Sequence, residues 1–429
     1  MLTNKDTVRD YRMLSVSEET ATERHLYFGK SVYLLVLLLI SVDFFHFTPI
    51  SAFTTDDICL VLFFIWLIAG IFLYKPKQQL FSITLNRWYW PLPAVWLGVL
   101  ISFLAAKALF DQALFVSLVA SRRMFSMLAL PVLGIVNPRM KDVEKAVVWF
   151  SLVLLVFSVL DAVGVPILDR DFFINDSKPW KKLIEDDSFV MLLPGFQWVA
   201  VAFYFYLHRL KVSVNAGNIV GCLFFIAALF LMQNRTTLFV SSAIFAYTLL
   251  TLKGQRPLHT VFFRAASVLL IVGAVALTLP QWISLVTETS SQLGNDDYNR
   301  ILAYNYFLFN ACPKFIYYLT GVGFISATTS PIIGDLMDSG IYNSDVGFVG
   351  FWNYYGIIPV IAFFIVVIDG LRRRTPLFVK YNAILILVGS LTIACFNTID
   401  KILWLCVFIY MVYGAAWNTE PSLEIDDNA

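Results

Sequence analysis

Long apolar runs separated by short polar stretches dominate this chain from one end to the other. A helix needs about 20 mainly apolar residues to cross a bilayer, and about 12 segments approach this length. We predict membrane spans near residues 31–47, 58–74, 88–106, 112–137, 145–166, 190–207, 216–233, 237–252, 262–281, 347–368, 381–397 and 402–417. The pattern therefore predicts an all-α polytopic membrane protein with about 12 transmembrane helices.

The predicted spans form one transmembrane domain, 31–417, between an N-terminal tail (1–30) and a C-terminal tail (418–429). Most of the 31 lysines and arginines fall on the side that holds the N-terminus, and such residues are retained in the cytoplasm. We therefore predict that both tails are cytoplasmic. Two long loops, about 167–189 and 282–346, then lie on the outer face. Because the second contains apolar stretches (YNRILAYNYFLFNA and KFIYYL), we expect it to fold into a small helical cap on the membrane.

Composition supports a membrane protein and excludes a soluble globule. Hydrophobic residues make up 59% of the chain, charged residues only 14%, and the mean hydropathy is +0.74. The 16% of aromatic residues agrees, because Trp and Tyr gather at membrane–water boundaries. The formal net charge of +1 gives no indication of a nucleic-acid partner.

Metal or cofactor chemistry has little support in the sequence. Most of the five cysteines lie in hydrophobic runs, so no disulfide framework is visible. The four histidines show no ligand spacing, and none lies in an outer loop: His25, His46, His208 and His259. Asp169 and Asp171 form a D-x-D pair that can hold a divalent cation with a pyrophosphate, but this pattern is weak. We therefore expect neither a metal centre nor a cofactor.

Arg235 gives the strongest local signal for a functional site. In LFLMQNRTTLFVSSAIF, only a few polar residues separate two predicted spans at the outer face, and Asn234 is suited to cap the helix that begins there. A helix N-terminus offers free N–H groups, so an arginine beside it makes a phosphate site. We expect Asn234 and Thr236 to bind substrate together with Arg235. The alternative is that Arg235 extends to the lipid headgroups.

Two further candidates lie in and after the second long outer loop. Arg300 begins an amphipathic stretch near the membrane, and the TGVGF segment that follows predicts a flexible turn. Asp345 lies where the span near 347–368 starts, so it either caps this helix or faces a substrate as an ionised carboxylate. In the helix that follows, Asn353 is a candidate for substrate binding.

Four charged residues are expected inside the predicted spans. Arg122 and Arg123 lie in LVASRRMFSMLALPVLG, and Asp43 and Asp161 fall in other spans. Charges inside a membrane are costly and usually functional. The two arginines either pair with one of these aspartates or line a polar cavity, and we count both as candidate substrate-binding residues.

Three motifs occur in an order that resembles a superfamily of bacterial envelope enzymes. They are QNRTTLF, Arg300 followed by LTGVGF, and NSDVGFVGFWNYYGI, and together they span roughly residues 218–368. In these features the chain is similar to the O-antigen polymerase and ligase superfamily, the Wzy-like and WaaL-like glycosyltransferases. The resemblance implies a GT-C-like core, a location in the bacterial inner membrane and an active site at the periplasmic face.

The resemblance also implies a reaction. Polymerases of this type join oligosaccharide repeat units, linked to undecaprenyl pyrophosphate, into O-antigen, capsule or exopolysaccharide. On this basis Arg235 and Arg300 would clamp the donor pyrophosphate, and Asp345 would accept the proton of the attacking sugar hydroxyl, without a metal. Besides the bilayer, the partners would be a chain-length regulator and a flippase, and not nucleic acid.

Two other functions stay open. Ligases of the superfamily usually carry a histidine in the segment that matches 343–347, where this chain has Ser344 and Asp345. This difference favours a polymerase over an O-antigen ligase, which transfers the chain to lipid A core. Outside this class, the alternative is a polysaccharide flippase. The sequence shows no evident repeat of two halves and carries a large outer loop, which disfavours transport.

Overall fold

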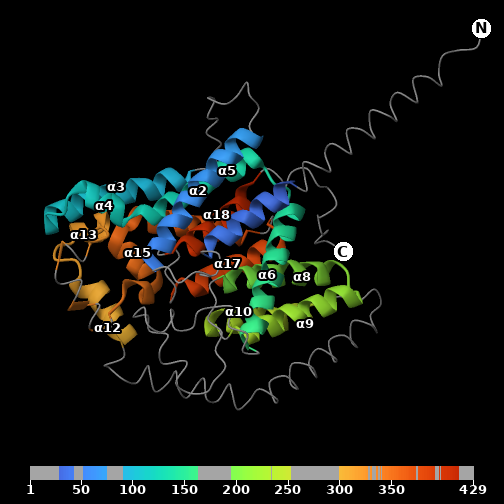
Figure 1. Ribbon diagram of the computed structural model, residues 1–429. Helices are drawn as coiled ribbons and strands as arrows, with labels where there is room; N and C mark the ends of the chain where they lie inside the picture. Colours follow the sequence, from blue (N-terminus) through green and yellow to red (C-terminus); the bar gives the residue numbers. More distant parts are fainter. Residues whose placement is uncertain are drawn as a thin grey trace, which may run out of the picture.

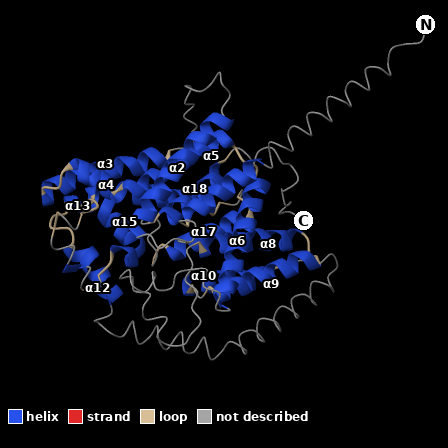
Figure 2. Cartoon of the chain, viewed as in Figure 1, coloured by secondary structure: helices blue, strands red, loops and turns tan. Residues whose placement is uncertain are grey.

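The described part of the chain is built from helices joined by loops and contains no strand (Figures 1 and 2). The computed structural model describes residues 29–42, 52–74, 90–162, 195–232, 234–252, 299–326, 329–330, 335–336, 339, 341–372, 375–391, 396 and 398–414. The all-helical fold is confirmed for these ranges, and their long apolar helices support a membrane protein. The predicted span near 262–281 and the loop near 167–189 lie outside the described residues.

Most of the helices fall within the predicted spans or within the predicted cap. In chain order they are the helix Gly29–Ser41, α2 (Ala52–Tyr74), α3 (Pro91–Phe110), α4 (Leu114–Ala120), the 3₁₀ helix η4 (Arg122–Leu128), α5 (Ala129–Val136), α6 (Met140–Ala162), α8 (Phe196–Val212), α9 (Ala216–Leu231), α10 (Arg235–Leu250), α12 (Asn299–Asn305), the π-helix η6 (Tyr306–Asn310), α13 (Ile316–Thr320), the 3₁₀ helix η7 (Asn343–Val346), α15 (Gly347–Tyr355), α16 (Ile357–Gly370), α17 (Leu377–Gly389) and α18 (Ile399–Tyr413).

Within the described residues, three helices are long and apolar enough to cross a membrane. They are Asp57–Tyr74, Pro91–Phe110 and Met140–Leu160. The pair Leu114–Ala120 and Arg122–Val136, which is bent by 63°, makes a fourth if it forms one span. Shorter apolar helices, including α9, α10, α16 and α17, complete the bundle. The fold therefore combines continuous membrane helices with interrupted ones.

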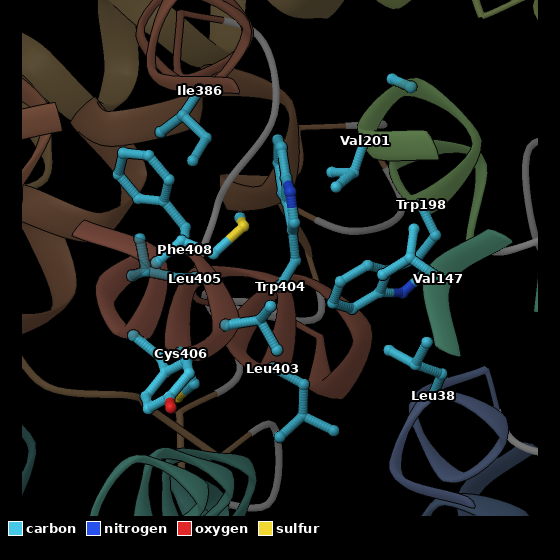
Figure 3. Packing of buried hydrophobic residues seen from close by; sticks show 14 of the residues in the cluster. Leu38, Val147, Trp198, Val201, Ile386, Leu403, Trp404, Leu405, Cys406 and Phe408 are labelled. Carbon is cyan, nitrogen blue, oxygen red and sulfur yellow. The ribbon is translucent and has the colours of Figure 1, made fainter. Parts of the chain in front are cut away.

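Helices α8 and α18 form the centre of the bundle. All residues of Gln197–Phe205 in α8 and of Ile402–Met411 in α18 are buried. Helices that are apolar on every side are buried in this way, because they have no polar face to expose. Figure 3 shows Trp404 of α18 in the core that also contains Val201 of α8 and Ile386 of α17. Helices α6, α9, α10 and α17 pack against α8, and η4, α5, α16 and α17 pack against α18.

The predicted span near 347–368 is two helices, because α15 and α16 are separated at Gly356. Gly356 has a φ of 78°, in the left-handed region that favours glycine. The last turn of α15 lacks helical partners for its carbonyl groups. The segment TGVGF replaces these partners: Val322 N donates to Asn353 O at 2.8 Å, and Gly323 N donates to Tyr354 O at 2.9 Å. Backbone N–H groups of the cap therefore satisfy the carbonyl groups at the break.

TGVGF is a docked segment whose backbone lies directly against the helix break, and not the flexible turn that its glycines predict. Gly321 has a φ of 75°, and a Cβ on it would lie 2.3 Å from Tyr354 O. A Cβ on Gly356 would lie 2.3 Å from Leu319 O. No side chain fits on either side of this contact, so the two glycines permit the close approach of the two backbones.

This geometry predicts that Gly356→Ala destabilises the protein. The added Cβ meets backbone atoms and forces a strained φ, and we expect a cost of about 2 to 4 kcal/mol. The measurement is the midpoint of thermal unfolding of the purified protein, followed by circular dichroism. The matched control is Gly217→Ala near the start of α9, where the nearest atom to a Cβ is 3.5 Å away. Equal midpoints for the two variants would contradict the close backbone contact.

Candidate functional site

A second helix is broken at Ser121, between α4 and η4. The helices on the two sides of Ser121 are bent by 63°. The chain continues without a loop, because Ser121 N donates to Ser117 O at 3.0 Å and Met124 N donates to Ser121 O at 2.9 Å. The bend places Arg122 and Arg123 at the start of the second helical piece. Both predicted arginines therefore lie at an interruption of the membrane helix.

Arg122 forms an ion pair with Asp57 of α2. Its Nε lies 2.6 Å from Asp57 Oδ1, and the Asp57 side chain is 58% exposed. Such a half-exposed pair contributes less than about 1 kcal/mol. It links the start of η4 to α2, against which η4 and α5 also pack. Asp43 and the side chain of Asp161, the partners considered from the sequence, lie outside the described residues.

Arg123 lines a cavity between the two helix breaks. The lining residues are Ala120, Ser121, Arg123, Met124, Phe324, Asn343, Phe351, Tyr354, Tyr355 and Phe396. The volume open to the centre of a water molecule is about 20 Å³. This space admits about one or two water molecules and no whole sugar. The cavity therefore suits one small polar group.

The cavity walls combine aromatic rings with hydroxyl and amide groups. The rings of Phe351 and Phe396 stack with centroids 3.7 Å apart. Asn343 is fixed beside them, because its Nδ2 donates to Gly350 O at 3.0 Å. The hydroxyl of Tyr355 lies within the electric field of Arg123. A polar group that enters would meet one cation inside a largely apolar wall.

Arg300 and Asp345 lie on two elements that pack against each other. Arg300 is in α12 and Asp345 is in η7, and these elements are in contact. Ala303 and Phe307 form one small hydrophobic cluster with Val346 and Val349. Helices α12, η6 and α13 confirm that the apolar stretches of the second long loop are helical.

The side chain of Arg300 is partly buried. Its Nε is buried and finds no hydrogen-bond partner. One turn further on, the hydroxyl of Tyr304 donates to Leu391 O beyond the end of α17. Burial raises the pKa of Tyr304, and the charge of Arg300 acts in the opposite direction. Tyr304 therefore stays protonated at neutral pH and anchors α12 to the bundle.

Asp345 does not N-cap the helix that follows it. It belongs to the 3₁₀ turn η7, and Val346 occupies the N-cap position of α15 without a side-chain hydrogen bond. The N–H of Phe348, in the first turn of α15, has no partner within the helix and donates to Ser390 O at 2.7 Å. The capping alternative for Asp345 is therefore wrong for α15.

Asn234 caps α10, as its position predicts. Its side-chain oxygen accepts a hydrogen bond from Thr237 N at 3.0 Å. Arg235 is the first residue of α10, and its side chain lies outside the described set. Thr236 follows in the first turn and is half-buried. The capped N-terminus that the phosphate-site hypothesis needs is therefore present.

The start of α10 lies at the same end of the bundle as α12 and η7. The hydroxyls of Thr248 and Tyr381, 3.0 Å apart, join the last turns of α10 to the first turns of α17, and the two helices pack along each other. They are therefore antiparallel, and Arg235 lies at the end where α17 finishes. At that end Ser390 and Leu391 accept the hydrogen bonds from the cap and from α15.

Asn353 has a structural role in the described conformation. It is 5% exposed, and its Nδ2 donates to Cys312 Sγ at 3.5 Å. Its backbone carbonyl accepts the hydrogen bond from Val322. The side-chain amide and the backbone carbonyl of Asn353 thus hold the cap against α15. Asn353 is not among the residues that line the cavity.

Sequence reasoning missed the helix breaks and two residues that depend on them. The sequence did not identify Asp57 as the partner of Arg122 or Asn343 as a residue that lines the cavity. Two signals were available in the sequence. One is the pair of arginines after a serine in an apolar run, and the other is Gly356 between two aromatic residues and Pro359.

A metal-binding cluster is not found among the described residues. No group of three or more His, Cys, Asp or Glu side chains comes together in that part of the chain. Asp169 and Asp171 lie outside it, as do His25, His46 and His259. His208 is buried in α8.

Comparison with known proteins adds no assignment. No protein-family model matches this sequence, and no curated protein is significantly similar to it. Function must therefore be inferred from the residues and the fold.

The contact between Asn353 and Cys312 predicts a protected thiol in the cap. Cys312 is 7% exposed, and burial raises the pKa of its thiol to about 11. Because the thiolate is the reactive form, we expect no labelling of Cys312 by a membrane-impermeant maleimide at pH 7, measured by peptide mass spectrometry. The control is Lys314→Cys, an exposed position two residues away that should be labelled readily. Labelling of both thiols at similar rates would contradict the buried contact.

Proposed function

We propose that this protein is a membrane glycosyltransferase that polymerises a surface polysaccharide. Its donor is an oligosaccharide linked to undecaprenyl pyrophosphate, and its product is O-antigen, capsule or exopolysaccharide. The proposal includes about 12 spans with a GT-C-like core in the bacterial inner membrane, with both termini in the cytoplasm and the site at the periplasmic face. A chain-length regulator and a flippase are its expected partners.

One observation carries the proposal: Arg300, Asp345 and the capped start of α10 belong to elements at one end of the bundle. α12, which carries Arg300, contacts η7, which carries Asp345, and the antiparallel packing of α10 on α17 puts the start of α10 at the same end. Two cations and a carboxylate at one membrane face are the groups that this transfer requires. The buried and unpaired Nε of Arg300 supports a role as a hydrogen-bond donor to an anion.

The proposed reaction needs charge stabilisation and one proton acceptor. The oxygen of the acceptor sugar forms a bond to the anomeric carbon of the donor, and the bond from that carbon to the pyrophosphate oxygen breaks. Undecaprenyl pyrophosphate leaves with the electron pair, and Asp345 takes the proton of the attacking hydroxyl. Arg235 and Arg300 stabilise the negative charge that develops on the leaving oxygens. Pyrophosphate is a good leaving group, so no general acid is required.

Two alternatives are retained. An O-antigen ligase would use the same donor and transfer the chain to lipid A core, and the acceptor distinguishes the two enzymes. Ser344 and Asp345, in the segment where ligases usually carry histidine, favour the polymerase. A flippase would move the lipid-linked oligosaccharide without forming a bond. Purified protein that polymerises lipid-linked repeat units in detergent, without a second compartment, would exclude this function.

Removing either arginine of the clamp should abolish long polymer. We expect Arg235→Ala and Arg300→Ala to reduce polymerisation at least about 100-fold, because each removes an interaction with the developing charge. The measurement is the ladder of polysaccharide chain lengths from a host that supplies the repeat unit. Immunoblots of membrane fractions give the amount of each variant. A wild-type ladder from either variant would refute the clamp.

Asp345→Asn tests the carboxylate separately. Asparagine has nearly the same shape as aspartate and also forms turns, but it cannot accept a proton at neutral pH. We therefore expect normal amounts of protein in the membrane and a loss of polymer of at least about 100-fold. A normal ladder from this variant would assign Asp345 a structural role in η7. The matched control is Asp111→Asn, which changes an exposed carboxylate in the loop between α3 and α4.

A further inference from the structure

Four large apolar side chains of the cap are exposed. Phe309 of η6 is 70% exposed, and Phe315, the N-cap residue of α13, is 76% exposed. Ile316 and Leu319 of α13 are also exposed, and their spacing of three residues puts them on one face of the helix. We call these four side chains the apolar face of the cap. Exposure of such a face to water is costly, so a contiguous apolar surface of this kind usually marks an interaction site.

Tyr318 fixes the other side of α13 to the protein. Its hydroxyl donates to Leu308 O at 2.6 Å, and its backbone carbonyl accepts a hydrogen bond from Trp352 Nε1 at 2.6 Å. The rings of Tyr318 and Trp352 also pack together, with centroids 5.8 Å apart. These contacts hold α13 in one orientation. Ile316 and Leu319 therefore cannot turn toward the bundle unless the contacts of Tyr318 break.

Helix α13 lies at the end of α3, which is long and apolar enough to cross a membrane (Figure 1). Leu109 and Phe110, in the last turn of α3, pack on the same small hydrophobic cluster as Tyr317 of α13. Lys107 and Asp111 form an exposed ion pair at this end of α3. Because charges are costly in hydrocarbon, this pair indicates the level of the lipid headgroups. The apolar face of the cap is therefore close to the boundary between headgroups and hydrocarbon.

The exposed surface of α3 is apolar up to this boundary. Its exposed residues recur at intervals of three and four and form one stripe: Leu97, Leu100 and Leu104. Leu104 precedes Phe110 by about 9 Å along the helix axis. Helix α16 packs along α3, also contacts α13, and has a similar stripe: Ile361, Ile365 and Ile368. In helices that cross a bilayer, exposed apolar stripes contact lipid. The apolar face of the cap thus lies where two lipid-facing helices end.

We propose that α13 is an interfacial anchor, whose apolar face inserts into the lipid leaflet at the membrane face where α3 ends. Lys314 is exposed directly before Phe315, and its ammonium group stays at the level of the headgroups. The four side chains offer no hydrogen-bonding group, which suits hydrocarbon better than a sugar chain or the polar rim of a protein partner. The sequence predicts a cap on the membrane, and the structure identifies the face that enters it.

An anchor at this position acts on the helix break at Gly356. Thr320 is the last residue of α13 and the first of TGVGF, the segment that bonds the carbonyls at the end of α15. Insertion of α13 therefore holds TGVGF at the depth of the break. This role does not depend on glycosyl transfer.

Spin labels on the full-length protein in lipid nanodiscs test the proposal. Phe315→Cys and Leu319→Cys are introduced singly into a Cys395→Ser background, because the other four cysteines are buried. Power saturation measures the collisions of each label with oxygen, which concentrates in hydrocarbon, and with nickel–EDDA, which stays in water. Since an interfacial face lies about 5–10 Å deep, we expect a ratio of oxygen to nickel accessibility at least about three-fold higher than at Lys314→Cys.

Lys314→Cys is the matched control, because this exposed position is adjacent to Phe315 and carries a polar side chain. Leu104→Cys on α3 is the reference for a label in lipid, and its ratio should equal or exceed that of Phe315→Cys. The background protein without an added cysteine gives the signal from native thiols. If Phe315→Cys is not monodisperse, Leu319→Cys and Phe309→Cys carry the test, because exposed side chains contribute little packing.

Three results would refute the anchor. Nickel accessibility at the cap labels equal to that of Lys314→Cys would place the apolar face in water. Low accessibility to both probes would mean that another protein or a second copy of the chain covers it. A high ratio at Leu104→Cys alone would place the edge of the hydrocarbon below the cap. Failure of the glycosyltransferase proposal would appear in the polymer ladders and would leave these accessibilities unchanged.

Discussion

Backbone polar groups inside a membrane must find partners within the protein, and the arrangement of this bundle depends on how two helix breaks meet that requirement. At Gly356 the carbonyls released by α15 are bonded by Val322 and Gly323, which belong to the cap. The cap therefore supplies the hydrogen-bond donors that the end of α15 needs. This docking fixes the end of α15, from which Tyr354 and Tyr355 reach the cavity. The loop that holds Arg300 is consequently tied to the bundle.

At the second break, two adjacent arginines have different surroundings. Arg122 turns toward α2 and is neutralised by Asp57, while Arg123 lines the cavity. A bend of 63° separates their helical piece from α4. The breaks at Ser121 and Gly356 meet at one cavity, so the two interruptions form a single feature of the fold.

Hydrophobic periodicity was sufficient to predict most of the described helices and the helical nature of the loop that contains Arg300. The residue type at position 234 predicted the cap of α10, whereas the cap expected at Asp345 is not formed at α15. These features depend on residues close together in sequence, such as Asn234 and the N–H of Thr237. The breaks depend on partners far along the chain, as when Val322 bonds Asn353, and hydropathy does not report such partners. For the same reason, Asp57 could not be found as the partner of Arg122. The contacts of the candidate residues could therefore not be predicted from the sequence.

The continuity of the core bears on the choice between enzyme and transporter. One hydrophobic cluster extends from Tyr33 to Met411 and includes the central helices α8 and α18. Alternating access requires two bundles that rock against each other around a site near the middle of the membrane. Here the charged candidates of α10, α12 and η7 lie at one end of the bundle, and the central helices pack into one shared core. The position of these three candidates at one end of the bundle agrees with the proposed reaction, because fixed groups stabilise developing charge without having to reorganise.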